Sequence, residues 1–156
     1  MKIDFTWLRE NILHRDIEAS EKAALAWFFD VKTYEAGETI VEQNLSGEKL
    51  YILRSGSAEI VREANGTQTR ITSAREGDLL GELSFLNGDL TSARVIAQEE
   101  SIVYALTRDA FSKMMLQHQN LVYSLFAHML EHTAEIIRHM NGEHVGMMQY
   151  IMGRKA

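Results

Sequence analysis

The amino-acid sequence predicts a mainly β domain of the α+β class, in which a sandwich or roll of antiparallel strands is flanked by helices. A length of 156 residues with 46% hydrophobic content fits one hydrophobic core. From Val31 to Thr107 the chain consists of short runs rich in Val, Ile, Tyr, Leu and Thr, separated by glycine-containing turns about ten residues apart. Before and after this stretch, apolar residues recur with helical spacing. We therefore expect a single domain over 1–156, with a helix and the strands over about 20–107, C-terminal helices over 108–141 and a tail over 142–156.

Two helices are expected before the strands, from about Asp4 to His14 and from Ser20 to Phe29. Ser20 is the expected N-cap of the second helix, because a serine hydroxyl accepts hydrogen bonds from the N–H groups of the first turn. The second helix carries an apolar stripe of Ala24, Leu25, Phe28 and Phe29. Both helices are therefore expected to pack against the domain and not to catalyse.

The β region divides into runs that are separated by turns at Gly56 and Asn65-Gly66. The Asn-Gly pair is typical of a tight hairpin turn, because both residues tolerate a positive φ. The expected strands are Lys49–Arg54, Ser57–Arg62 and Thr67–Ser73, with Val95, Val103 and their neighbours closing the sheet. Turns at this spacing are typical of an antiparallel sandwich or roll.

Helical spacing returns after the strands, with one helix over Asp109–Gln117 and a longer one from Asn120 to about Met140. Apolar positions of the longer helix follow one another at intervals of 4, 3, 4, 3 and 4, at Val122, Phe126, Met129, Thr133, Ile136 and Met140. Such spacing is typical of a coiled-coil seam. We predict a homodimer through this helix; the alternative is that the stripe covers only the chain's own core.

Composition excludes several classes of protein. The chain has no cysteine, so it forms no disulfide framework and no thiolate site. Its formal net charge is -6 with lysine and arginine spread along the chain, which argues against direct DNA binding. The N-terminus lacks the apolar region of a signal peptide, and no run is long enough to span a bilayer. We expect a cytoplasmic protein without membrane insertion.

The segment Gly81 to Gly88, followed by Thr91 to Val95, predicts a pocket for a phosphate that carries a ribose. Gly81 allows a sharp turn and a close approach of the backbone to a ligand. A helical turn that begins at Glu82 would direct free N–H groups at an anion. The Glu82 carboxylate can accept hydrogen bonds from a sugar hydroxyl, and Ser92 can donate one to phosphate.

These residues belong to a longer set of landmarks: Ala36-Gly37-Glu38, Gly47 before Leu50-Tyr51-Ile52-Leu53, Ser55-Gly56, Glu76-Gly77-Asp78, Gly81-Glu82-Leu83-Ser84 and Ser92-Ala93. In this order and spacing, from about Ser20 to Met140, the chain resembles the cyclic nucleotide-binding domain of the catabolite activator and protein kinase A regulatory family. The resemblance implies a double-stranded, jelly-roll-like antiparallel β-roll, with the long helix as lid and dimer interface. It implies cyclic AMP or cyclic GMP as ligand, with ligand-binding residues Gly81, Glu82, Leu83, Ser84, Thr91 and Ser92. Glu82 would hold the ribose; Ser92, Thr91 and the backbone N–H groups of Leu83 and Ser84 would hold the phosphate.

The sequence departs from this family at Thr91, where members that bind cyclic nucleotides generally carry an arginine. Threonine offers one neutral hydroxyl in place of a charged, often bidentate contact, and the loss of such a buried partner costs roughly 2–5 kcal/mol. Strand alternation places Arg94 on the opposite face, so it is not expected to compensate. Over the base the resemblance places Ile136 and Ile137, which favour stacking without hydrogen-bond selection. Because only 16 residues follow Met140, we expect no DNA-reading domain.

One competing motif lies on the long helix. His128-Met129-Leu130-Glu131-His132 matches the His-x-x-Glu-His arrangement of some zinc peptidases, with two imidazoles one turn apart. No third ligand is identifiable, so we expect no catalytic residue, no metal and no cofactor. Solvated histidines, an incidental metal linked to the dimer and a pH-sensitive seam remain the alternatives.

The sequence therefore predicts a regulatory module and not an enzyme. Its ligand would be a cyclic nucleotide that binds weakly, or another small anion, and it would signal through its C-terminal helix to an unidentified downstream protein. The alternative is a dimeric scaffold that has lost ligand binding. Thr91 favours the scaffold, whereas Gly81, Glu82 and Ser92 favour binding.

Overall fold

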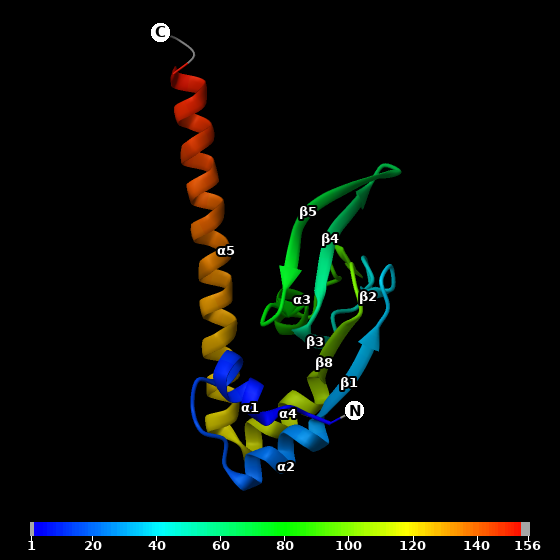
Figure 1. Ribbon diagram of the computed structural model, residues 1–156, viewed down its shortest axis with the longest axis vertical. Coiled ribbons are helices and arrows are strands. Elements are labelled where there is room, and N and C mark those ends of the chain that lie inside the picture. Colours follow the sequence, from blue (N-terminus) through cyan, green and yellow to red (C-terminus); the bar gives the residue numbers. More distant parts are fainter. Residues whose placement is uncertain (1, 154–156) are drawn as a thin grey trace.

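The computed structural model describes residues 2–153, with side chains described as far as residue 142 (Figure 1). Two groups of helices flank the strands in the sequence, and one short helix, α3, lies between the sixth and seventh strands. Their bounds are α1 Phe5–Leu8, η1 Arg9–Leu13, α2 Ala19–Phe28, β1 Phe29–Tyr34, β2 Thr39–Val41, β3 Lys49–Ser55, β4 Ser57–Ala64, β5 Thr67–Arg75, β6 Leu79–Leu80, α3 Glu82–Asn87, β7 Arg94–Ala97, β8 Ser101–Thr107, α4 Arg108–Gln117 and α5 Gln119–Gly153.

The strands form two antiparallel sheets that face each other. One sheet has the order β1-β8-β3-β6 and the other the order β2-β7-β4-β5, so strands distant in sequence become neighbours. The hairpin between β4 and β5 turns at Asn65 and Gly66, both with positive φ, as expected for an Asn-Gly turn. This arrangement confirms the predicted α+β fold with an antiparallel β-roll and a long C-terminal helix (Figure 1).

The sheet that contains β3 and β8 is buried on both faces. Leu50 and Leu106 point into a core shared with the helices, whereas Leu53 and Val103 point into a second core between the two sheets. Alternate residues of a strand lie on opposite faces, so burial of both faces requires a nearly continuous apolar run. The run Ile102-Val103-Tyr104-Ala105-Leu106 meets that requirement.

The helices gather on the outer face of this sheet. α1, η1, α2, α4 and the first half of α5 contribute to its core, and in Figure 1 they lie together at the lower end of the molecule. The predicted first helix is an α-helical turn followed by the π-helix η1. The prediction of Ser20 as N-cap was wrong: Glu18 caps α2, and the Glu21 carboxylate accepts a hydrogen bond from the Glu18 N–H at 3.0 Å in a reciprocal capping box.

Helix α5 is longer than predicted. It was expected to end near Met140, but it continues to Gly153, so most of the predicted tail over 142–156 is helical. Residues 154–156 lie outside the described residues. The Asn141-Gly142 pair is typical of a helix end, yet glycine within a helix costs only about 1 kcal/mol, and the chain contains no proline to end the helix.

The predicted dimer seam divides into two parts. Val122 and Met129 are buried and Phe126 packs against them, all within the chain's own core. In this structure the sheet and the N-terminal helices cover that face, as in the alternative in which the stripe packs on the chain's own core, and the dimer interface stays a prediction. Thr133 is half-buried and donates to the Met129 carbonyl, whereas Ile136 and Met140 are exposed.

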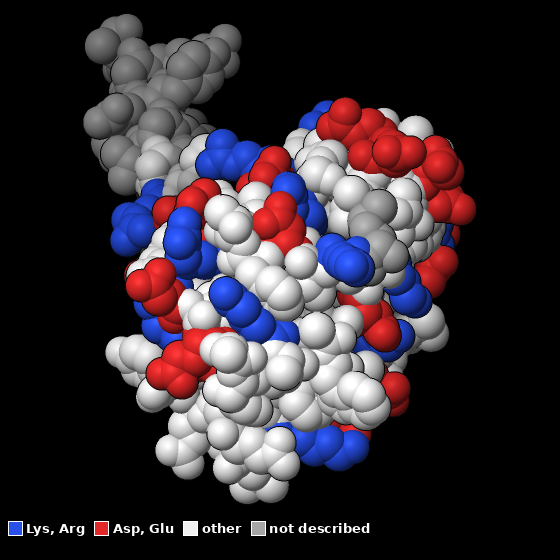
Figure 2. All heavy atoms as spheres, turned by 60° about the horizontal axis from the view of Figure 1, so that its bottom comes forward, with Lys and Arg blue, Asp and Glu red and all other residues white. Residues whose placement is uncertain are grey.

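The surface carries charges of both signs. On the described part of the face in Figure 2, basic side chains are interspersed with acidic ones and do not form one continuous patch. Among the described residues, no helix combines the length and the apolar character that a bilayer span needs. In Figure 1 the second half of α5 extends past the roll.

Candidate ligand-binding site

A cavity of about 160 Å³ lies between the roll, the α3 segment and α5. All six ligand-binding residues predicted from the sequence line it: Gly81, Glu82, Leu83, Ser84, Thr91 and Ser92. The other lining residues are Val41, Ile60, Leu79, Leu80, Ala93, Val95, His132 and Ile136. The described lining is thus largely apolar with a few polar groups, and it includes no lysine or arginine.

Two glycines bound the helix that forms one wall. Gly81 has φ +75°, a conformation that other residues rarely adopt, and it begins α3. Gly88, with φ +80°, ends it. The Leu83 side chain is 64% exposed, whereas Ser84 is buried and its hydroxyl donates to the Leu90 carbonyl at 3.3 Å. The Ser84 side chain therefore holds the segment together, and only its backbone N–H is oriented like a helix N-terminal donor.

Glu82 brings a carboxyl group into the cavity wall. Burial raises the pKa of Glu82, and the negative charge of Asp78 adds to that effect. Its own backbone N–H and the nearby His132 act in the opposite direction without cancelling it. A desolvated carboxylate at this position is suited to accept hydrogen bonds from hydroxyl groups of a ligand.

Thr91 is committed to the backbone of the neighbouring loop. Its side-chain oxygen lies within hydrogen-bond distance of the Glu42 and Leu45 carbonyls, and it accepts from the Leu45 N–H at 3.1 Å. The Thr91 backbone exchanges further bonds with Asn44 and Leu45. Thr91 therefore fastens the loop after β2, and its hydroxyl has little capacity left for a phosphate.

Ser92 and Arg94 follow on the same segment. Ser92 is exposed and lines the cavity, so its hydroxyl remains available to a ligand. Arg94 does not line the cavity, and its Nε lies 3.1 Å from a carboxylate oxygen of Glu42. The alternation of β7 thus turns this arginine away from the position that Thr91 leaves without a cation.

His132 is a site residue that was not predicted. It projects from α5 into the cavity wall, where its Nε2 lies 3.4 Å from Oδ1 of Asp78. The hydrogen bond with Asp78 raises the pKa of His132. Its Nδ1 is buried and has no hydrogen-bond partner among the described residues. One signal in the sequence could have found it: His132 precedes Ile136 by one helical turn and so shares its face.

The predicted apolar cover is half correct. Ile136 lines the cavity, as expected, but Ile137 does not and is 52% exposed. Consecutive helical residues differ by about 100° in direction, so both could not face the same cavity. The predicted trio of His128, Glu131 and His132 also separates, because His132 turns to Asp78 whereas the His128 ring faces Gly77.

Arg108 joins the α3 segment to the C-terminal helices. Its guanidinium donates to the carbonyls of Gly47 and Ser84 at 2.9 Å each and of Phe85 at 3.1 Å. Gly47 lies so close to this segment that an added Cβ would stand 2.2 Å from the Ser84 Cβ. No local motif identifies Arg108, because its three partners lie at least 23 residues away in sequence.

Comparison with known proteins identifies the family. The family model of the cyclic nucleotide-binding domain matches residues 31–118, more than half of the chain. A cAMP-dependent protein kinase regulatory subunit of Aspergillus fumigatus is 33% identical over 109 residues, which cover 70% of this chain and 26% of that protein. The chain thus spans between about a quarter and two fifths of the length of the curated relatives it matches.

Two solved structures extend the comparison to the fold. A cyclic nucleotide-binding domain from Methylobacillus flagellatus superposes with a TM-score of 0.78 at 17% identity, covering 92% of this chain and 81% of that one. The regulatory subunit of a cAMP-independent protein kinase A from Trypanosoma cruzi, bound to guanosine, gives a TM-score of 0.63 at 29% identity. The match covers 79% of this chain and 43% of that one. With the β-roll, the α3 segment and the matching family model, the chain belongs to the cyclic nucleotide-binding domain family.

Proposed function

We propose that this chain is a non-catalytic regulatory module that binds a small ligand in the roll and signals through α5. One observation carries the proposal: a single cavity is lined both by the predicted ligand-binding segment and by His132 and Ile136 of α5. A ligand that occupies the cavity therefore contacts the helix whose position a partner protein would sense. The named relatives are regulatory subunits, which supports a regulatory role over an enzymatic one.

The proposed ligand is a nucleoside or a weakly bound cyclic nucleotide. The described cavity lining offers Glu82 and Ser92 to hydroxyl groups but no lysine or arginine to a phosphate, and the Thr91 hydroxyl is already bonded. The carboxylates of Asp78 and Glu82 disfavour a more highly charged anion. The relative that is bound to guanosine supports this class, since guanosine carries no phosphate.

Signalling would require α5 to move. Ligand pockets usually enclose about 300–1,000 Å³, more than the 160 Å³ between the roll and α5. Entry of a nucleoside would displace the wall formed by His132 and Ile136 and lengthen the contact between His132 and Asp78. The helix thus has two positions, one with an empty roll and one with a filled roll, and the ligand shifts the population between them.

A dimeric scaffold without a ligand is the second candidate. The small cavity and the bonded Thr91 hydroxyl favour it. In either case we propose that two copies associate through the middle of α5, where apolar side chains lie exposed at Leu130, Ile136, Ile137 and Met140. Direct DNA binding and membrane insertion form no part of either proposal, and the cytoplasmic location stays a prediction.

Isothermal titration of wild type and Thr91→Arg with guanosine, cyclic AMP and cyclic GMP tests the proposal. We expect wild type to bind guanosine and to bind the cyclic nucleotides weakly. The arginine should tighten cyclic-nucleotide binding by tens to thousands of fold, the equivalent of roughly 2–5 kcal/mol, and leave guanosine unchanged. Thr91 is buried, so an arginine there could disturb the fold, and thermal unfolding of Thr91→Arg checks that the variant folds. Thr91→Val is the control for loss of the hydroxyl alone.

The two candidates give different results. If wild type releases no heat with any ligand and Thr91→Arg binds cyclic nucleotide, the roll is intact but unused, and the scaffold is correct. If wild type binds and Glu82→Gln weakens binding of all three ligands, the sensor is correct. Binding that is unchanged in Glu82→Gln would place the ligand outside the proposed cavity.

A further inference from the structure

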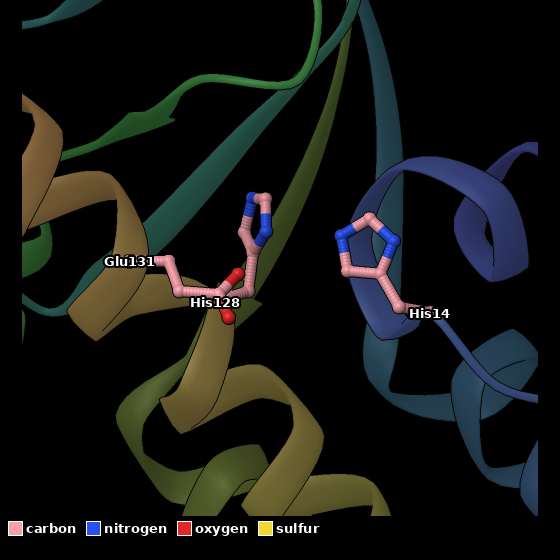
Figure 3. A group of neighbouring side chains, drawn as sticks. All are labelled: His14, His128 and Glu131. Carbon is pink, nitrogen blue, oxygen red and sulfur yellow. The ribbon is translucent and has the colours of Figure 1, made fainter.

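Three side chains that bind metals elsewhere in proteins meet on the side of α5 that faces η1. His14 follows η1 directly, with a left-handed backbone of φ 52°, and His128 and Glu131 lie one turn apart on α5. One ligand atom from each lies within 4.8 Å of the other two. Figure 3 shows the His14 ring directed across the gap at the His128 ring, with the Glu131 carboxylate beside it.

The orientation of His128 leaves one ring nitrogen available. Its Nε2 lies 3.2 Å from the Gly77 carbonyl, which can only accept a hydrogen bond. Nε2 must therefore carry the proton, and in the neutral imidazole Nδ1 keeps its lone pair. Burial lowers the pKa of His128, and the neighbouring His132 and His14 add to that effect. A neutral imidazole whose second nitrogen donates to a backbone carbonyl is the usual form of a histidine metal ligand.

We propose that His14, His128 and Glu131 form a binding site for a divalent transition-metal ion, with zinc the best match. Two imidazoles and one carboxylate are a known zinc ligand set that leaves a fourth position for water. Tetrahedral ligands about 2.1 Å from zinc stand about 3.4 Å apart. In this structure the three ligand atoms lie within 4.8 Å of one another. They reach the spacing of a zinc site if rotation of the exposed His14 and Glu131 side chains moves their ligand atoms about 1 Å toward His128.

The surrounding charges do not oppose a cation. Arg15 lies beside the site, but its guanidinium is bonded to the Glu21 carboxylate at 2.6 and 2.8 Å and to the Ser124 hydroxyl at 2.8 Å. His132, which the sequence motif offered as a ligand, is held by Asp78 on the side of the nucleotide cavity. The surface is hollowed here, in a pocket that His14, His128 and Glu131 line together with Tyr123.

The site has a structural consequence that is independent of the ligand in the roll. His14 belongs to the N-terminal segment, whereas His128 and Glu131 belong to α5, and His128 contacts the turn at Gly77, next to Asp78. A bound metal would fasten the N-terminal segment to α5 beside the turn that holds His132. Metal would therefore stabilise the helix position seen in this structure and oppose its displacement.

Titration of the chelator-treated protein with Zn²⁺ tests the proposal. We expect one Zn²⁺ per chain, an increase in the melting temperature, and with Co²⁺ the intense visible absorption of a tetrahedral site. His14→Gln should lower the affinity about 100-fold and remove the increase in melting temperature. Because His14 is exposed, this variant is expected to fold, which keeps the test decisive if His128→Gln does not.

Two matched variants separate this site from the alternatives. His118→Gln, on another helix end, and His132→Gln should bind Zn²⁺ as wild type does. Loss of binding in His132→Gln with retention in His14→Gln would overturn the proposal in favour of the sequence motif. Binding of half an equivalent of Zn²⁺ per chain would indicate an ion shared between two copies and would contradict the proposal. Absence of saturable binding at micromolar Zn²⁺ would also contradict it.

Discussion

His132 of α5 contacts Asp78 of the turn before β6, with 3.4 Å between Nε2 and Oδ1. The two residues are separated in the sequence by β6, α3, β7, β8 and α4, so the contact joins the C-terminal helix to the roll beside the cavity that His132 lines. Asp78 also accepts a hydrogen bond from the Arg75 N–H at 2.9 Å, which fixes its carboxylate. The contact therefore holds α5 against the roll through two side chains that both titrate.

The first prediction is a dependence of stability on pH. Burial alone would raise the pKa of Asp78, but hydrogen bonds from His132 and the Arg75 N–H outweigh it and lower that pKa below 3.8. The bond with Asp78 raises the pKa of His132 above 6.5. Stabilisation by Asp78 is lost as the pH falls through its lowered pKa, and stabilisation by His132 is lost as the pH rises through its raised pKa.

The pair should therefore stabilise the fold most between about pH 4 and 6.5. We expect the difference in unfolding free energy between wild type and His132→Gln to shrink by about 1 kcal/mol from pH 6 to pH 8, because a charge-assisted hydrogen bond becomes a neutral one. Urea unfolding at each pH measures it. The unfolding free energy of Asp78→Asn should lack this pH dependence as well. A free-energy difference between wild type and His132→Gln that grows from pH 6 to pH 8 would contradict the assigned charges.

The second prediction concerns Arg108, whose guanidinium holds three carbonyls around the α3 segment. Arg108→Gln should lower the unfolding free energy by about 2–3 kcal/mol, since hydrogen bonds from a charged donor to partly buried acceptors are lost. Arg108→Lys should restore only part of it, because an ammonium group lacks the planar fork. Hydrogen exchange should quicken in α3 in both variants. The exposed Arg62→Gln serves as control and should change stability by less than about 0.5 kcal/mol.

The third prediction compares two glycines with opposite expected outcomes. Gly47→Ala places a Cβ 2.2 Å from the Ser84 Cβ and 2.6 Å from its carbonyl carbon, so the loop must move away from the α3 segment. We expect a loss of about 1–3 kcal/mol and weaker ligand binding. Gly142→Ala meets no atom within 4 Å and should increase helix content. Circular dichroism and urea unfolding distinguish the two; equal effects would show that close approach at Gly47 is unimportant.

The fourth prediction tests association through α5. Sedimentation velocity should show a dimer for wild type, and Leu130→Glu or Met140→Glu, at exposed apolar positions, should shift it toward the monomer. A charge in an apolar interface is costly because it loses water without gaining a partner. Leu116→Glu, also exposed but on α4, is the control. A compact monomer at all concentrations would end the dimer proposal.

The sequence by itself determined the class of fold and the six residues of the phosphate-binding segment that line the cavity. The spacing of glycines set the turns, and Gly81, which requires a positive φ, marked the start of α3. These are local properties of the chain, so they could be predicted without tertiary structure. The six predicted site residues line one cavity, and all six lie within two short segments, residues 81–84 and 91–92, that are close together in the sequence.

Only the tertiary structure decided which partners distant residues acquire. His132 seemed to belong with His128 and Glu131 because all three share a helix, but the roll places Asp78 beside His132 and η1 places His14 beside His128. The spacing of Val122 and Met129 on α5 predicted contact with a second copy, whereas in the structure the sheet and the N-terminal helices cover both residues. Periodicity records that a face is apolar and not what covers it, because the covering residues come from elements far away in the chain.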